Sequence, residues 1–212
     1  EVLITGGSNP GGCLTLKYDA AGVLAWSRHA ASLGWGRCII VDSLGAPTVA
    51  STAVGDHTVL MRYSSDGDST WAATVAGVNP VGLVHDGPGN VYTATTTYPE
   101  PPDWRVAKVG PFGDVVWELG ISGPSGSRDL ASSIAISGGD ALYVAGQWSD
   151  SREHCMLARV ATGGSVAWKR FFDGPGDEND GSIPEGALAM SGDRVCLFAS
   201  EWAVGGHLDW SV

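Results

Sequence analysis

The chain has 212 residues, is 43 % apolar and carries a formal net charge of −11, with 23 acidic residues against 12 basic ones. It has no apolar run near the roughly 18 residues that a membrane-spanning helix needs, so we expect a globular chain that is not membrane-embedded. The acidic field repels phosphate backbones, which excludes nucleic acid as a favoured partner.

The first twelve residues, EVLITGGSNPGG, have the character of a strand and contain neither an initiator methionine nor a signal peptide. We therefore expect the chain to be processed or to be a segment of something longer. A second strand, CLTLKY, follows at 13–18 and leads into YDAAGVLAW, where a glycine stands four residues before Trp26. The same spacing recurs in SSDGDSTW, GPFGDVVW and ATGGSVAW, which place tryptophans at 71, 117 and 168, at intervals of 45, 46 and 51 residues.

Each repeat contains four short apolar runs separated by turn-forming residues. The second repeat reads CIIVDS (38–43), APTVAST (46–52) and TVLMRY (58–63), followed by the motif that ends in Trp71. Many runs are apolar on both alternating sets of residues, so sheets must cover both of their faces. One further feature recurs in every copy, a basic residue nine positions before the tryptophan: Lys17, Arg62, Lys108 and Arg159.

Four-stranded units of about 45 residues with Gly-rich turns and a recurrent tryptophan predict an all-β fold, a β-propeller of four-stranded antiparallel blades. We expect about 4.5–5 blades here, as part of a larger ring. A solenoid is the alternative fold, and a five-bladed ring with overlapped closure is the alternative to a larger ring. The expected blades are 1–35 (partial), 36–79, 80–125, 126–178 and 179–212 (partial), with Trp26, Trp71, Trp117 and Trp168 packed between blades.

The stretch GSRDLASSIAISGGDALYVAGQW, followed by CMLARVATGGSVAWKRFFDG, resembles the bacterial seven-bladed β-propeller (SBBP-type) repeat. The resemblance covers essentially the whole chain and is strongest at 126–172. It implies an exported or cell-surface bacterial protein with a binding or structural role. The turn-and-tryptophan motif is also similar to that of pyrroloquinoline-quinone enzymes, and SSDGDSTW is similar to the sialidase Asp-box except at Asp68.

The connections from second to third and from fourth to first strands are long and varied, whereas the others are short and uniform. Variable loops on a rigid scaffold are where binding usually resides. These loops carry aromatic residues beside charged ones, which would suit a carbohydrate or a protein ligand. An alternative interpretation is that each tryptophan only covers a blade end. The candidate ligand-binding residues are Trp35, Trp104, Trp148, Trp202, Asp150 and Arg152.

No complete catalytic motif or cofactor motif is found, so we expect no cofactor. Asp177, Asn179 and Asp180 offer hard oxygen ligands that calcium prefers. Their spacing departs from an EF-hand loop, so a solvated acidic loop is the favoured interpretation. Three histidines stand at equivalent strand starts and are interpreted as exposed: His57, His154 and His207. The four cysteines include no CxxC pair, so disulfides and free thiols are both open: Cys13, Cys38, Cys155 and Cys196.

The leading hypothesis is a non-catalytic binding scaffold whose variable loops form the ligand face. The alternatives are an enzyme, either a glycan hydrolase or lyase or a quinoprotein-like oxidoreductase, and a purely architectural module of a surface assembly. Few acid or base candidates stand near the expected axis, namely Arg37, Asp129 and Glu185, which favours binding over catalysis.

Overall fold

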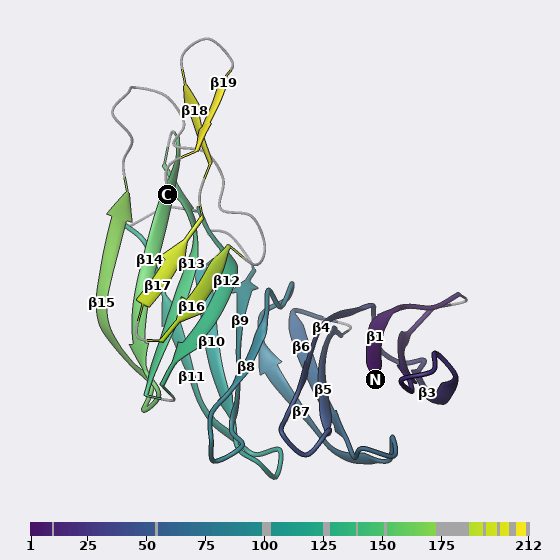
Figure 1. Cartoon of the computed structure of the whole chain (residues 1–212). Coiled ribbons are helices and arrows are strands. Elements are labelled where there is room, and N and C mark those ends of the chain that lie inside the picture. The colour runs from purple at the N-terminus through teal and green to yellow at the C-terminus, as the bar shows by residue number, and fades with distance from the viewer. Residues whose placement is uncertain are drawn as a thin grey trace.

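The computed structural model of the chain is all-β, and its described residues form strands without any helix (Figure 1). Side chains and backbone are described for 1–9, 11–53, 55–98, 103–124, 128–138, 140–150, 152–172, 187–192 and 194–198, and the backbone alone is described for 200–203 and 207–210.

The strands pair with their neighbours in sequence to form successive antiparallel meanders. The first sheet is β1 (Val2–Gly7), β2 (Cys13–Tyr18) and β3 (Leu24–Ala30). The second sheet is β4 (Gly36–Val41), β5 (Pro47–Thr52), β6 (His57–Tyr63) and β7 (Ser69–Ala76). The third sheet is β8 (Leu83–His85), β9 (Val91–Thr97), β10 (Asp103–Val109) and β11 (Val115–Ile121).

The fourth sheet is β12 (Arg128–Ser137), β13 (Ala141–Ser149), β14 (Glu153–Ala161) and β15 (Ser165–Phe172). Two short pairs follow, β16 (Leu188–Ser191) with β17 (Arg194–Leu197), and β18 (Ser200–Ala203) with β19 (His207–Trp210). The sequence run RVCLFASEW (194–202) is thus divided between β17 and β18. The three strands of the first sheet correspond to the second, third and fourth strands of the other sheets, because turn 19–23 matches turn 64–68.

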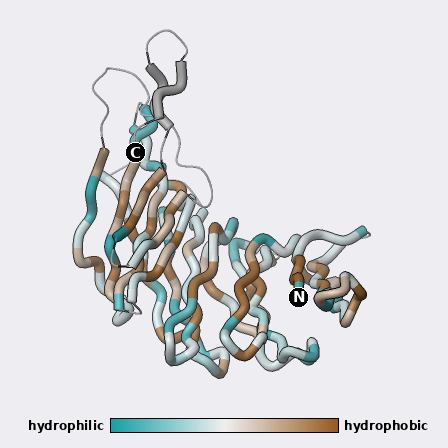
Figure 2. The backbone as a smooth tube through the Cα atoms, viewed as in Figure 1, coloured by the Kyte–Doolittle hydropathy of each residue, from teal (hydrophilic) through white to brown (hydrophobic). Residues whose placement is uncertain are grey.

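The sheets stack face to face, and a cluster of apolar side chains lies at each junction. Cys13 of the first sheet packs with Met61 and Tyr63 of the second, and the other face of the second sheet packs on the third through Leu60 and Val109. The third and fourth sheets share the largest cluster. Figure 2 shows the hydrophobic stretches along the facing strands. Strands that are apolar on both faces are therefore explained by sheets on both sides.

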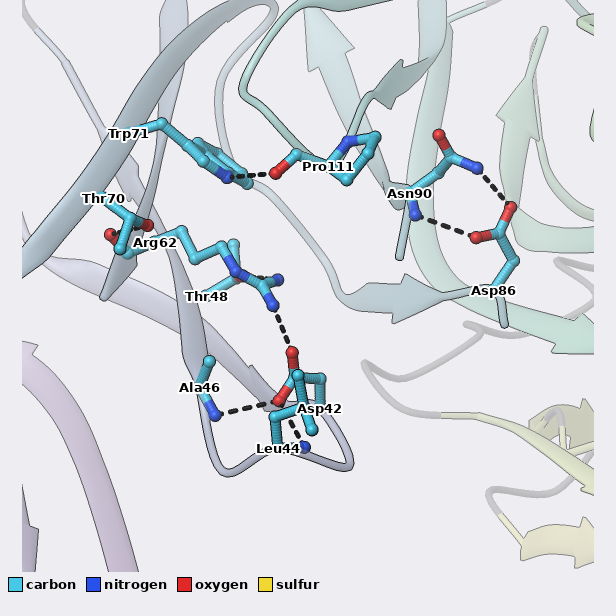
Figure 3. Close-up of polar contacts among 10 residues, drawn as sticks. All are labelled: Asp42, Leu44, Ala46, Thr48, Arg62, Thr70, Trp71, Asp86, Asn90 and Pro111. Atoms are coloured by element: carbon cyan, nitrogen blue, oxygen red, sulfur yellow. Dashed lines mark hydrogen bonds and ion pairs between the residues drawn. The ribbon is translucent and has the colours of Figure 1, made fainter. Parts of the chain in front are cut away.

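The recurrent tryptophans join each sheet to the next one along the chain. The indole Nε1 of Trp26 donates to the Ser65 carbonyl at 3.0 Å, and that of Trp71 donates to the Pro111 carbonyl at 3.0 Å (Figure 3). Trp117 repeats the contact with the Thr162 carbonyl at 3.1 Å. Each acceptor lies in the turn between the third and fourth strands of the next sheet. Each junction therefore needs one such turn and one tryptophan ring, which explains why both recur along the sequence.

The antiparallel pairing divides the connections between two ends of the stack. The tight-turn end consists of the hairpin turns 19–23, 42–46, 64–68, 86–90, 110–114 and 161–164. The hairpins that join β12 to β13 and β16 to β17 lie at the same end. The loop end consists of the connections after β1, β3, β5, β7, β9, β11 and β13. This arrangement of four-stranded antiparallel blades is the β-propeller-like fold that the sequence predicts.

Candidate binding surface

Two carboxylates of the tight-turn end, Asp42 and Asp86, accept hydrogen bonds within their own turns. Asp42 accepts hydrogen bonds from the amides of Leu44 and Ala46, both at 2.9 Å, and pairs with the Arg62 guanidinium (Figure 3). Asp86 accepts from the Asn90 amide at 2.8 Å and from its side chain at 2.7 Å (Figure 3). The Tyr92 hydroxyl also donates to Asp86, at 2.8 Å.

These contacts keep both carboxylates ionised. Burial raises the pKa of Asp42, but the hydrogen bonds of its turn and the charge of Arg62 outweigh burial and hold the pKa below its usual value. Burial likewise raises the pKa of Asp86, and the hydrogen bonds from Asn90 and Tyr92 outweigh it. Burial and the neighbouring Asp86 raise the pKa of Tyr92. Asp42 and Asp86 therefore stabilise the hairpin turns in which they lie.

At the loop end, Trp35 presents an exposed indole on top of the first sheet. The residue is 68 % exposed. Its ring nevertheless lies close to Gly7, because a Cβ added to that glycine would be only 2.6 Å from the Cδ1 atom of Trp35. The ring therefore rests against the backbone of β1, where glycine leaves room for it. Next to Gly7, the Ser8 hydroxyl lies 2.7 Å from His29 Nε2.

The pair of Ser8 and His29 is built for hydrogen bonding rather than for nucleophilic catalysis. His29 Nε2 lies 2.9 Å from the Gly11 carbonyl oxygen, and Ser8 Oγ donates to the same carbonyl at 3.0 Å. Because a carbonyl oxygen only accepts, this geometry fits the tautomer with the hydrogen on Nε2. A nitrogen that carries the hydrogen cannot take a proton from Ser8.

A second aromatic group lies at the loop end of the fourth sheet. Trp148 stacks on His154, with ring centroids 4.1 Å apart, and meets Phe171 edge-on at 5.9 Å. His154 Nε2 lies 3.4 Å from Asp150 Oδ1. The structure thus brings Trp148 and Asp150 together through His154. The Arg152 backbone amide lies in the same hairpin and donates a hydrogen bond to Asp150 Oδ1 at 3.0 Å. Trp35 and Trp148 lie on different sheets.

Two expectations about this surface are corrected. Trp104 is fully buried, and a Cβ added to Gly146 of the next sheet would lie 2.6 Å from its ring. It therefore packs in the core between the third and fourth sheets and contacts no ligand at the surface. His154, expected to be exposed, is buried beneath Trp148, whereas His57 is exposed.

The repeat itself contains the signal for the burial of Trp104. Trp104 stands four residues before Lys108, just as Cys13 and Thr58 stand four residues before Lys17 and Arg62, and all of these side chains are buried. The stacked pair depends on hairpin register, which composition and motif spacing do not reveal: Trp148 and His154 lie directly opposite each other across β13 and β14.

Several predicted residues cannot be placed on this surface. Asp177, Asn179, Asp180 and Glu185 lie outside the described residues, and Trp202 lies in β18, of which only the backbone is described. Among the described side chains, no group of three or more histidines, cysteines or acidic residues could hold a metal ion. The four cysteines are free thiols. The described residues form no helix with the length and apolarity of a membrane span.

No family model and no curated protein sequence matches the chain. Among solved structures, it is similar to an engineered GH43 glycoside hydrolase with endo-xylanase and exo-arabinofuranosidase activity, a β-propeller, with a TM-score of 0.50, 15 % identity and coverage of 96 % of this chain and 48 % of that one. A Bacteroides caccae protein of unknown function matches with a TM-score of 0.48, 14 % identity and coverage of 78 % and 59 %. The chain spans about half the length of these structures, and identities this low show the fold alone.

Proposed function

We propose that the chain is a non-catalytic binding scaffold that presents its loop end to a carbohydrate. The observation that carries the proposal is the Trp35 indole, which is held flat against Gly7 with its outer face exposed. A rigid aromatic face beside a few polar groups is typical of small-molecule sites. Fixing the ring in advance also lowers the entropy that a ligand must remove on binding.

The polar groups around Trp35 favour a neutral, hydroxyl-rich ligand. Ser8 directly follows Gly7, on which the ring rests, and with His29 it offers a hydroxyl and an imidazole without a carboxylate in their contacts. A strongly anionic ligand would be repelled by the net charge of −11. The aromatic group of Trp148 and Phe171 provides a second apolar surface at the same end, and Phe171 is 45 % exposed.

The turn carboxylates Asp42 and Asp86 are suited to holding turns and not to hydrolysis. A glycosidase needs a carboxylic acid whose pKa is raised so that it can protonate the leaving group. The pKa values of Asp42 and Asp86 are both lowered, so these two carboxylates do not meet that requirement. Both also belong to hairpin turns at the opposite end of the sheets.

The test is a glycan array followed by titration calorimetry on any glycan that binds. Trp35→Ala should weaken binding by at least tenfold, which corresponds to about 1.4 kcal/mol. Gly7→Val should have a similar effect, because its added Cβ displaces the ring without removing it. Phe112→Ala is the matched control, since Phe112 is an exposed aromatic residue at the tight-turn end.

Three results would contradict the proposal. If no glycan binds, or if Phe112→Ala weakens binding as much as Trp35→Ala, the ligand face is misassigned. If the chain turns over an aryl glycoside, the scaffold is an enzyme. If only a protein partner is captured, and Trp35→Ala abolishes that capture, the loop end binds protein instead of carbohydrate.

We further propose that the protein is exported or located on a bacterial surface. This placement rests on the resemblance to SBBP-type repeats. Protease treatment of intact cells should remove the chain, whereas a chain that stays protected until lysis would contradict this location.

A further inference from the structure

The three junctions between successive sheets share one contact, in which a tryptophan covers a glycine turn. A Cβ added to Gly67, Gly113 or Gly164 would lie 2.8, 2.9 or 3.0 Å from the nearest atom of Trp26, Trp71 or Trp117. The three glycines have φ values of +87°, +89° and +90°. The turn carbonyl two residues before each glycine accepts the indole hydrogen bond. The contact therefore fits one turn shape with no side chain on the glycine.

Basic side chains reinforce the contact at the first junction. Lys17 Nζ donates to the Ser65 carbonyl at 3.0 Å, the same oxygen that Trp26 uses. Arg28 donates from Nε to the Gly67 carbonyl at 2.5 Å. Its NH1 group binds the preceding Ser27 carbonyl, which fixes the side chain with its guanidinium carbon 5.8 Å from the Trp26 ring. We call this trio of donors the carbonyl clamp.

A second complete carbonyl clamp stands on the fourth sheet. Arg159 lies opposite Trp168 in β14 and β15, as Lys17 lies opposite Trp26. Arg170 repeats the fixed conformation of Arg28: its NH1 group binds the preceding Lys169 carbonyl at 3.1 Å, and its guanidinium carbon lies 5.2 Å from the Trp168 ring.

This clamp has no turn to hold among the described residues. Neither Arg159 nor the Trp168 indole makes a hydrogen bond in the described part of the chain, and Arg170 binds only the carbonyl of its own neighbour. Leu188 and Leu197 of β16 and β17 pack on the same face of the fourth sheet. They add apolar contacts and leave these donors without a carbonyl.

The first sheet supplies the complementary half. Its turn 19–23 has the same two backbone hydrogen bonds as turn 64–68. Asp19 N donates to Val23 O and Gly22 N donates to Asp19 O. In turn 64–68, Ser64 N donates to Asp68 O and Gly67 N donates to Ser64 O. Gly22 has a φ of +78°, and a Cβ added there would meet nothing within 4 Å. By position in the turn, the Ala20 carbonyl corresponds to that of Ser65.

The face of the first sheet that carries this turn also has apolar residues left uncovered. Leu16 and Tyr18 correspond to Met61 and Tyr63, which are buried against the preceding sheet. Their partners across the strand pair, Ile4 and Val2, are 49 % and 55 % exposed. A surface of this kind favours a packed partner over water.

We propose that these two halves meet between two copies of the chain, so that turn 19–23 of one copy docks on Arg159, Trp168 and Arg170 of the next. Because the two surfaces differ, the association is head-to-tail and can continue or close into a ring. The partner is a second copy because turn 19–23 has the shape, the glycine and the carbonyl that the carbonyl clamp holds at the first junction. This inference concerns the tight-turn end and is independent of the proposed carbohydrate site.

The test is sedimentation velocity of the 212-residue chain over a range of concentrations. The wild-type chain should self-associate as concentration rises. Gly22→Asn should weaken association at least tenfold, because asparagine tolerates positive φ but adds a Cβ that meets the ring. Trp168→Phe should weaken it as well, because it keeps an aromatic ring and removes the Nε1 donor. Gly45→Asn is the matched control, since Gly45 has a φ of +77° and an added Cβ there meets its nearest atom at 3.9 Å.

Mixing the two variants provides the decisive measurement. Trp168→Phe retains an intact turn and Gly22→Asn retains an intact clamp, so a mixture should give heterodimers and nothing larger. A chain that stays monomeric at all concentrations would overturn the proposal. So would association that Gly22→Asn and Gly45→Asn affect equally, or association that depends on Trp168 and is unchanged by Gly22→Asn.

Discussion

The two ends of the stacked sheets are built on opposite principles. At the tight-turn end, the same few contacts recur at each junction: a glycine with positive φ, a carbonyl and a tryptophan from the neighbouring sheet. At the loop end, the contacts differ from sheet to sheet, with a Ser–His pair and Trp35 on the first sheet and a stacked Trp–His pair on the fourth.

The difference shows where the sequence is constrained by folding and where it is not. A contact that joins two sheets must fit both of them, so its residues recur in each copy of the repeat. A residue at the loop end contacts fewer neighbours, and its identity can vary without loss of the stack. Substitutions at the two ends should therefore differ in their cost to stability, and the following predictions test that contrast.

The largest effect is expected at the internal turn glycines. Gly67→Asn should lower the free energy of unfolding by about 2–3 kcal/mol. The added Cβ would lie 2.8 Å from Trp26, so the two sheets would have to move apart at this junction. Gly22→Asn is the control, with the same turn conformation and no neighbour within 4 Å. Urea denaturation at a concentration where the chain is monomeric measures both. Equal losses would mean that backbone conformation, and not the tryptophan contact, sets the cost.

The turn carboxylates should give the next largest effect, and it should depend on pH. The folded pKa of Asp86 is lowered, so its contribution is present above its ordinary value of 3.8 and is lost as pH falls through the folded pKa. Asp86→Asn should cost about 1–2 kcal/mol at pH 7, because charged hydrogen bonds are lost, and the difference from wild type should shrink below pH 4. The exposed Asp114, changed to Asn, should alter stability little at either pH. A cost that persists unchanged at low pH would show that shape, and not charge, matters at Asp86.

A smaller effect is expected from single indole hydrogen bonds. Trp71→Phe keeps an aromatic ring at the junction and removes the donor to the Pro111 carbonyl. The expected loss is about 1 kcal/mol, the net value of one hydrogen bond in a folded protein. Thermal unfolding of Trp71→Phe and Trp117→Phe should give similar shifts, since the two contacts match. A neutral result at both positions would assign the junction energy to ring packing alone.

The sequence predicts the repeating part of this molecule well, because each strand, turn and tryptophan occurs several times and neighbouring copies can be compared. It predicts the loop end poorly, because each feature there occurs once. Trp104 shows how the two cases meet: its Pro-rich neighbourhood indicates a loop residue, whereas its repeat position, four residues before Lys108, is a buried position of β10, where the ring faces Gly146 of the next sheet. The space that a glycine on another sheet leaves for a ring is not visible in the local sequence.

The smallest effect on stability is expected at Trp35, although it should have the largest effect on binding. The ring rests on Gly7 and is 68 % exposed, so Trp35→Ala removes little buried surface. The free energy of unfolding should change by no more than about 0.5 kcal/mol, as for other surface substitutions. Denaturation of Trp35→Ala beside Phe112→Ala, which is exposed at the other end, measures this directly. A loss near 2 kcal/mol at Trp35 alone would mean that the indole holds the first and second sheets together, and the loop end would then share the structural role of the tight-turn end.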